Sequence, residues 1–516
     1  MAEKLKKWHF RPRYRITGHL YTKTPFFTGS GQTMPHPEIK KDDGKPAEVM
    51  AFPRAGKTPF IPGHTIKGCL RAWLAKREGN GYKTSLVKSV FGEESSGEDN
   101  NGLGGKALFL DAMLIAKRLE PTPLPIWNPA TQTYIETHVC IDRITGTAAE
   151  KMLFYQETVP PGVGFKLVVT GKFDPENHED EIALILAALD GFNDQDDPIL
   201  LGADTQTAKG QMSWELSCIE RIDKDDVKEW LNGPCRSGYK EIFKRLGQDE
   251  LNPLLTRAGE LFSNNKKSRF RAEITINFNS HFLINDPPGP KEMAEKKKAP
   301  EESDIPDMKP LYDEMGRPCL SPSSVRGALR SQAERIVRTM TQDTKSACHP
   351  DKNPCKADKA GDYEKLCPVC RIFGAPGWKS PLKITRFECI EAGEEMTQEF
   401  LAIDRFTGGG KSGAKFNVKA YYRPKFRGSI ELDLDRMAKA SKKDPSSALG
   451  LLGLLLRDLK EGDITFGLGS SKGYGTCKAE IDRWKDEVFR KDIKNGIEKL
   501  RKVLKEGKCA ISDNDT

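Results

Sequence analysis

The sequence predicts two α+β domains in tandem, and three observations lead to this prediction. Residues 59–71 read PFIPGHTIKGCLR and residues 318–330 read PCLSPSSVRGALR, so a turn and a basic helix start occur twice. The chain has 516 residues, which is too long for one hydrophobic core and suits two domains of ordinary size. Each half also alternates short strand-like runs with helical patterns, as an α+β domain does.

The first half begins with a loosely alternating strand at residues 14–27, followed by a polar loop rich in Gly and Pro at residues 29–57. After the turn-helix block, residues 107–114 are strand-like and residues 141–146 read IDRITG. A strand at residues 165–173, a helix at 182–189 and a Gly-flanked loop at 201–210 complete the half.

The second half repeats this order. It opens with a strand at residues 270–282, and the charged loop at 286–307 is expected to be mobile. The motif IDRFTG follows at 403–408 and a Gly-rich loop at 466–475. The repeat distance is 259 residues at Gly68 and Gly327, 262 at Asp142 and Asp404, and 263 at Lys209 and Lys472. Four blocks in one order indicate a duplication.

These blocks define the domain boundaries that we expect. The C-terminal segment has helical periodicity, with Trp484, Val488, Ile493 and Leu500 on its apolar side. The expected units are a first domain at 1–222, a helical connector at 223–267, a second domain at 268–480 with an insertion at 345–372, and a helix and tail at 481–516.

Composition and charge narrow the class of protein. The 82 Lys and Arg residues exceed the 74 Asp and Glu residues by only 8, so a polyanion site would need local clustering of basic residues. No apolar run reaches the roughly 18 residues of a membrane span, and the basic N-terminus lacks the apolar core of a signal peptide. We therefore expect a cytoplasmic protein with no membrane partner.

Four cysteines lie close together in the insertion. Cys348, Cys355, Cys367 and Cys370 have the spacing C-x6-C-x11-C-x2-C. Four soft ligands, two of them as C-x2-C, favour a tetrahedral structural zinc ion, and reduced free thiols are the alternative. Such a closed site has no position for substrate, so the metal would stabilise the fold.

The two helix starts carry basic residues that suit phosphate. Exposed amides and a positive side chain at a helix N-terminus attract anions, although plain helix capping is the alternative. The candidates are Lys67, Arg71, Arg326 and Arg330.

The motifs PGHTIKGCLR, CPVCRIFG, IDRFTGG and GLGSSKGYG, in this order, resemble those of the RAMP superfamily of CRISPR-associated proteins. The resemblance covers nearly the whole chain twice and is greatest to backbone subunits of type III effector complexes, especially the fused subunits of type III-D systems. It implies two modified ferredoxin-like (RRM-related) domains with thumb hairpins. It also implies binding to a CRISPR RNA guide, a complementary target RNA and other effector subunits.

The resemblance also directs attention to basic and aromatic residues. Between residues 405 and 428 there are seven basic residues, five rings and no acidic residue, a composition that suits phosphates and unstacked bases of single-stranded RNA. A solvated basic strand pair with core aromatics is the alternative. The RNA-binding candidates from these loops and their first-half equivalents are Arg143, Lys209, Arg405, Phe406, Lys411, Lys415, Lys472 and Tyr474.

Type III backbone subunits cut target RNA with an aspartate in the loop before the turn-helix block, and this position corresponds to Asp307. Its carboxylate would accept the 2′-hydroxyl proton or hold Mg²⁺ or Mn²⁺. In the first half the same count reaches Glu48, with Asp43 nearby. A solvated loop acid is the alternative for Asp307.

Two other functions remain open. One is a non-catalytic scaffold for the guide. The other is a guide-processing endonuclease, for which the first half offers His19, His36, His64 and His138.

Overall fold

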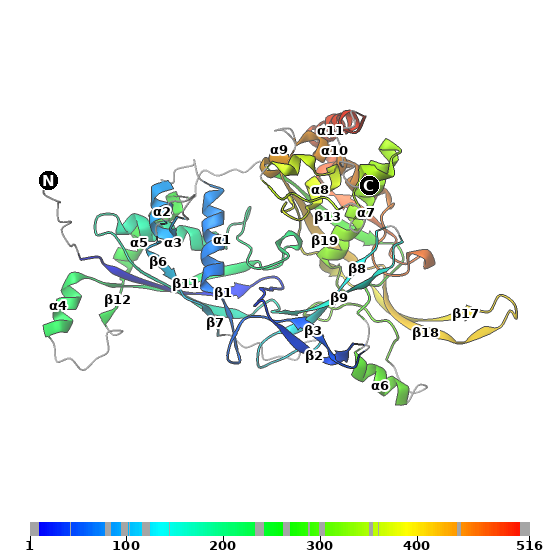
Figure 1. Cartoon of the computed structure of the whole chain (residues 1–516), viewed down its shortest axis with the longest axis horizontal. Helices are drawn as coiled ribbons and strands as arrows, with labels where there is room; N and C mark the ends of the chain where they lie inside the picture. Colours follow the sequence, from blue (N-terminus) through cyan, green and yellow to red (C-terminus); the bar gives the residue numbers. More distant parts are fainter. Residues whose placement is uncertain are drawn as a thin grey trace.

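The computed structural model describes residues 10–41, 43–77, 84–93, 102, 104–115, 124–143, 145–232, 242–261, 269–286, 289–298, 305–349, 354–359, 361–440 and 445–505. It forms two α+β domains joined in tandem, each with its own hydrophobic core (Figure 1). None of the described helices combines the length and apolarity that crossing a bilayer requires.

The first domain is built on an antiparallel sheet in which β1 is paired with β11 on one side and β10 on the other. The second strand of the fold, split into β6 and β7, pairs with β10. This order, fourth-first-third-second, is the ferredoxin-like order that we predicted. Its elements are β1 (Arg13–Thr22), α1 (Gly63–Ala75), α2 (Thr84–Phe91), β6 (Ala107–Phe109), β7 (Ala112–Leu114), β10 (Gly164–Lys172), α3 (His178–Asp190) and β11 (Met212–Ile222).

The second domain repeats this order, with β13 between β20 and β19 and with β15 and β16 on the far side of β19. Its elements are β13 (Arg269–Phe278), β14 (His281–Phe282), α7 (Pro322–Thr341), α8 (Pro368–Phe373), β15 (Leu382–Ile384), β16 (Glu388–Glu391), β19 (Lys425–Asp433), α9 (Leu434–Ala440), α10 (Ser446–Glu461) and β20 (Cys477–Ile481). The α+β prediction with two ferredoxin-like units is confirmed.

The alternation of buried and more exposed residues along the strands shows which face of each sheet the helices cover. In β1 every second residue is buried, including Tyr14, Ile16 and Leu20, so one face packs under α1 and α3. In β13 the buried residues Ala272, Ile274 and Ile276 have the same period of two. Their burial supplies most of the energy that holds each helix layer on its sheet.

A long hairpin projects from each domain. The first thumb consists of β8 (Tyr134–Ile141) and β9 (Ala148–Thr158), and the second thumb of β17 (Glu394–Ile403) and β18 (Gly410–Tyr422). The second thumb extends away from the molecule, whereas the first reaches the second domain (Figure 1). Equivalent residues are 262 apart: Glu136 pairs with Gln156 and Gln398 with Val418.

The prediction of a polar loop at residues 29–57 is wrong. Residues in it form β2 (Thr33–Lys40), β3 (Pro46–Met50) and β4 (Arg54–Ala55), and β3 pairs with β9. Prolines concealed the alternation in β3, where Ala47 and Val49 are buried. The charged loop at 286–307 likewise contains a helix, α6 (Pro290–Lys298), which contacts β2.

The segments expected outside the domains pack onto them. In the connector, which contains α4 (Lys224–Asn232), β12 (Lys244–Arg245) and α5 (Gln248–Glu260), β12 extends the first sheet beside β11. Leu254 and Ala258 of α5 enter the first core. The C-terminal helix α11 (Glu487–Lys505) packs on α10, where Ile493 lies against Gly453, and its Phe489 stacks on Phe270 of β13. Leu500 is also buried, whereas Val488 is exposed and was assigned to the wrong face.

Candidate functional site

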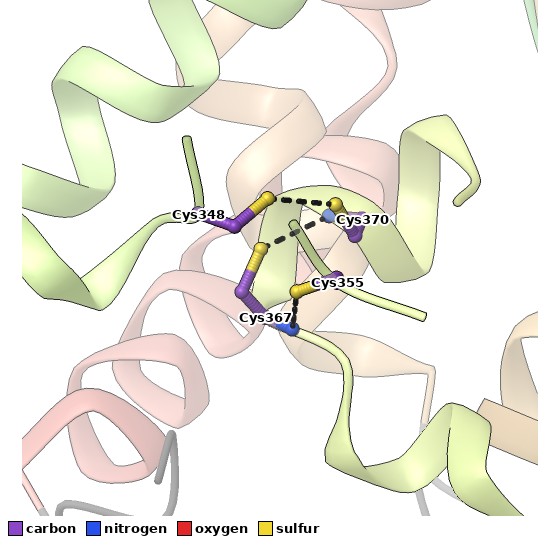
Figure 2. Close-up of side chains that lie close together, drawn as sticks. All are labelled: Cys348, Cys355, Cys367 and Cys370. Carbon is purple, nitrogen blue, oxygen red and sulfur yellow. Dashed lines mark hydrogen bonds between the residues drawn. The ribbon is translucent and has the colours of Figure 1, made fainter. Parts of the chain in front are cut away.

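The four clustered cysteines converge on one point. Their sulfur atoms all lie within 4.8 Å of one another, and Cys348, Cys367 and Cys370 are buried. Figure 2 shows Cys367 and Cys370, at the start of α8, facing Cys348 and Cys355 from the preceding loop. The sulfurs of Cys348 and Cys370 are 3.3 Å apart.

The donor set fits a zinc ion. Zinc–thiolate bonds of about 2.3 Å in a tetrahedron separate the sulfurs by about 3.8 Å, close to the observed spacing. The sulfurs also accept hydrogen bonds, from Cys367 N to Cys355 Sγ (3.4 Å), from Cys370 N to Cys367 Sγ (3.4 Å) and from Arg330 Nη2 to Cys370 Sγ (3.2 Å). Such donors stabilise thiolates and orient them for a metal. The four cysteines therefore could hold structural zinc.

Core cysteines behave differently. Burial raises the pKa of Cys319 and of Cys477 to about 12, so both remain thiols. Cys140, in contrast, is exposed on the first thumb.

The basic residues at the two helix starts bind protein carbonyls. Lys67 Nζ donates to Ala107 O at 3.3 Å, and Arg326 donates to Leu382 O at 3.2 Å and to Phe373 O. Burial, with a smaller effect of Arg71, lowers the pKa of Lys67, and burial lowers that of Arg326 to about 10. Equivalent cations thus tie each helix to the second strand of its sheet.

Protein oxygens also occupy the amides of these helix starts. Gly63 N donates to Asp111 Oδ1 at 2.8 Å, and Ser321 Oγ accepts from Ser324 N at 3.2 Å. This arrangement is the capping alternative, not an open phosphate site.

Two further RNA-binding candidates have protein partners. Arg330 binds the cysteine cluster as described above, and it also donates to Gly374 O at 3.4 Å. Arg143, at the tip of the first thumb, is half-buried and forms an ion pair with the buried Glu334 of α7. The structure therefore assigns both side chains to packing between protein segments.

The second thumb carries the basic and aromatic residues that are accessible. Arg405, Phe406, Lys411 and Lys415 are exposed, and 99% of Phe406 is accessible to solvent. Lys415 forms a solvent-exposed ion pair with Glu399 at 3.0 Å, which is weak enough to exchange for a phosphate. The tip is thus open to a ligand from several sides.

At the base of the second thumb, Lys472 lies over two stacked rings. Its Nζ is 4.5 Å from the Phe400 ring centroid and 4.6 Å from that of Phe416. Tyr474 is buried, stacks on His281 and donates its hydroxyl hydrogen to Gln398. Tyr474 therefore supports the thumb, and its ring is not accessible to an RNA base.

The base of the first thumb has an equivalent ring pair. The helical turns Thr205–Thr207 and Ser470–Lys472 are equivalent, so Lys209 corresponds to Tyr474 and not, as the repeat distance of 263 predicted, to Lys472. His138 stacks on Phe154, the pair equivalent to Phe400 and Phe416, whereas Lys209 forms an ion pair with Glu136. Burial would raise the pKa of Glu136, but Lys209 and His138 outweigh it and hold the pKa well below its usual range. Lys209 therefore binds a carboxylate of the protein in this structure.

Glycines of the closing loop approach protein backbone. A Cβ at Gly475 would lie 2.1 Å from Phe466 O, and at Gly467 2.2 Å from Leu283 O. Both have positive φ, which other residues rarely adopt. These two glycines fit the loop against the sheet, while Gly473 faces open space.

Asp307 lies beside the second thumb. Its Oδ1 is 2.8 Å from Lys296 Nζ of α6, and its Oδ2 accepts from Asn417 N of β18 at 2.9 Å. Burial would raise the pKa of Asp307, but Lys296 and the Asn417 amide outweigh it and lower the pKa. The side chain remains 31% exposed, so the carboxylate is ionised and partly accessible.

The first half places a different residue in this position. Met308 pairs with Val418, and the equivalent of Val418 is Gln156, which pairs with Met50. The residue that corresponds to Asp307 is therefore Val49, which is fully buried, and not Glu48. Glu48 points to solvent beside Lys41, and Asp43 accepts a hydrogen bond from Lys45 N in the adjoining turn.

The recurring aspartates of the IDR motifs fold the thumb tips. Asp142 Oδ1 accepts from Thr145 N at 2.9 Å, and Asp404 Oδ1 accepts from Phe406 N at 2.9 Å and Thr407 N at 3.0 Å. Their role is to shape a turn.

The four candidate histidines, His19, His36, His64 and His138, lie on four different elements: β1, β2, α1 and β8. His36 is buried, its Nδ1 accepts from Glu38 N and Ile39 N, and burial lowers its pKa. It therefore stays neutral and is not available to act as a general acid.

Sequence reasoning missed Glu334 and Asn417. Glu334 lies one helical turn after Arg330 and one before Arg338, and it also pairs with Arg143 from the thumb of the other domain. The spacing of four residues was a visible signal, but its thumb partner lies 191 residues earlier.

Comparison of the sequence with known protein families gives one match for each half of the duplication. No curated protein matches the sequence. A family model described as the RAMP superfamily matches residues 19–213 and, a second time, residues 249–478. One match falls on each half of the repeat, and together they cover most of the chain. With its two ferredoxin-like domains and their thumbs, the chain belongs to the RAMP superfamily.

Proposed function

We propose that the chain is a backbone subunit of a type III CRISPR effector, most similar to the fused subunits of type III-D systems. Membership of the RAMP superfamily supports a CRISPR-associated, RNA-binding subunit. The observation that carries the finer proposal is the pair of tandem domains, whose second thumb exposes Arg405, Phe406, Lys411 and Lys415. Guide RNA would bind along both domains, and the second thumb would separate bases of the guide–target duplex.

The exposed thumb suits this task because its groups are of two kinds. Lysine and arginine release counterions from phosphates, and an accessible ring stacks on an unpaired base. Lys472 adds a positive charge over Phe400 and Phe416 at the thumb base. Other effector subunits would extend the assembly at both ends.

We further propose that Asp307 cleaves the target strand. The carboxylate is ionised at neutral pH and would accept the 2′-hydroxyl proton of a kinked nucleotide, although its lowered pKa makes it a weaker base than an ordinary aspartate. Lys296 Nζ, 2.8 Å away, would neutralise the adjoining phosphate. No described group of three or more potential metal ligands surrounds Asp307. Mg²⁺ or Mn²⁺ would thus take this carboxylate and RNA phosphate oxygens, and would stabilise the developing charge.

One observation favours a second candidate, a non-catalytic guide scaffold. Both oxygens of Asp307 already have protein partners, Lys296 and Asn417. A scaffold would use Asp307 only to fasten α6 to the second thumb.

The first experiment is to purify the chain from cells that express a CRISPR array and to sequence the bound RNA. Array-derived RNA of uniform length supports guide binding. The assembled complex is then tested for target cleavage with Asp307→Asn and, as a matched control on the second thumb, Glu399→Gln. We expect Asp307→Asn alone to abolish cleavage opposite the second domain without reducing target binding. Unchanged cleavage would show that Asp307 is not the catalytic residue.

A further inference from the structure

The first thumb ends in a buried ionic socket of the second domain. Glu334 of α7 is buried and lies between Arg330 and Arg338, with a closest N···O distance of 3.5 Å to each. The third arginine at this carboxylate is Arg143, from the thumb tip of the other domain. Ser331 Oγ is also 3.5 Å from Arg143 O. The thumb is thus held by side chain and backbone.

The same two helix arginines bind the cysteine cluster. Arg330 Nη2 donates to Cys370 Sγ at 3.2 Å. Arg338 Nη2 donates to Cys348 O and Ala347 O, at 3.3 Å each. Each arginine therefore connects Glu334 to a cysteine that would ligate zinc, and the socket and the metal cluster share one network.

The second thumb provides an internal comparison. Arg405 is the repeat equivalent of Arg143, and the turns that present them are alike. Yet Arg405 is exposed, and among the described residues no ion pair involves it. The residue of α1 that corresponds to Glu334 is Ala75, which has no charge to offer. Within the part of the chain that the structure describes, the socket is therefore a feature of the second domain alone.

We propose that the cysteine cluster, with zinc bound, positions the first thumb by holding Arg330 and Arg338 around Glu334, which in turn holds Arg143. Glu334 is then a positioning residue that links the metal centre to the other domain. Metal loss releases Arg330 and Arg338, so the carboxylate loses its alignment and the thumb undocks. This coupling goes beyond RNA binding and cleavage, and it does not depend on them.

Trypsin tests the proposal on the full chain without RNA. The protease cuts after arginine, and cutting within a folded protein requires local opening. Arg143 is held in the socket, whereas Arg405 is free, so the ratio of cleavage at these two sites reports docking. In the zinc-loaded chain we expect slow cleavage at Arg143 and fast cleavage at Arg405.

Zinc removal by a chelator should raise cleavage at Arg143 about tenfold while leaving cleavage at Arg405 unchanged. Glu334→Gln should do the same with zinc still bound, as measured by metal analysis. The exposed neighbour Arg335→Ala is the matched control on α7 and should have no effect. Resistance of β13 to trypsin would show that the second domain is still folded without zinc. Unchanged protection of Arg143 in such zinc-free protein would overturn the proposal.

A third variant decides the case in which chelation unfolds the whole second domain. Arg330→Met removes one link between the cluster and Glu334 and is studied with zinc bound. Faster cleavage at Arg143 supports the coupling. Wild-type protection of Arg143 in Arg330→Met would show that docking is independent of the cluster.

Discussion

The two thumbs have the same strand register and the same turn at the tip, but they have different environments. The first thumb is anchored at both ends, by Lys209 with Glu136 at its base and by Arg143 with Glu334 at its tip. The second has Lys472 over rings at its base and a free tip with Phe406 exposed. Duplication thus preserved the backbone while side-chain partners diverged, so one thumb joins the domains and the other is free to bind ligand.

The largest effect on stability is expected from substitution of a cysteine that would ligate zinc. Cys367→Ser should remove zinc and destabilise the second domain by several kcal/mol, because metal binding is coupled to folding. Zinc content and chemical denaturation measure the two changes. Cys140→Ser, at an exposed cysteine of the first thumb, should preserve both quantities. Full stability after zinc loss would refute a structural role for the metal.

The closing loops, which the halves share, offer the next test. Gly475→Ala should cost about 3 kcal/mol, because its Cβ would overlap Phe466 O at positive φ. Gly473→Ala also has positive φ but meets no neighbouring atom, so about 1 kcal/mol is expected. Urea denaturation gives both values, and equal costs would contradict the close approach.

The lysines at the thumb bases sharpen the comparison further. Lys209→Met should cost about 2 kcal/mol, because the part-buried carboxylate of Glu136 would lose its lysine partner and keep only His138. The pKa of Glu136 should rise at the same time. Lys472→Met should cost only about 1 kcal/mol, the contribution of a cation–π contact. Urea denaturation of both variants measures the two losses of unfolding free energy. A larger loss for Lys472→Met than for Lys209→Met would contradict the prediction.

The smallest effect on stability is expected at the free tip. Phe406→Ala should not alter the free energy of unfolding, because its ring is 99% exposed. It should weaken binding to single-stranded RNA by about 1–2 kcal/mol, the contribution of one stacked base. Fluorescence anisotropy measures the affinity, with Val488→Ala as a control at another exposed apolar residue. Unchanged RNA affinity would remove Phe406 from the binding surface.

Much of the fold could be predicted because duplication repeats whole blocks in order. The ferredoxin-like core, the thumbs and the cysteine cluster all depend on local sequence. The partners of charged residues could not be predicted in this way. Lys67 and Arg326 look like phosphate ligands in sequence, but tertiary packing turns them toward strand carbonyls.

Register explains the difficulty at the candidate catalytic site. Counting from the helix block aligns Asp307 with Glu48, whereas the strand pairing of the thumbs aligns it with Val49. One residue of difference in a connecting segment moves a side chain to the other face of a strand. Counting residues cannot detect such a shift, because pairing with β9 and β18 sets the register.

The docked tip of the first thumb also has a consequence for the order of synthesis. Arg143 and Glu334 are 191 residues apart. At about 5–20 residues per second, a ribosome needs about 10–40 s to pass from one to the other. The hairpin itself pairs locally and long before that interval ends. The final tertiary contact of the first domain therefore forms only after translation has reached the second.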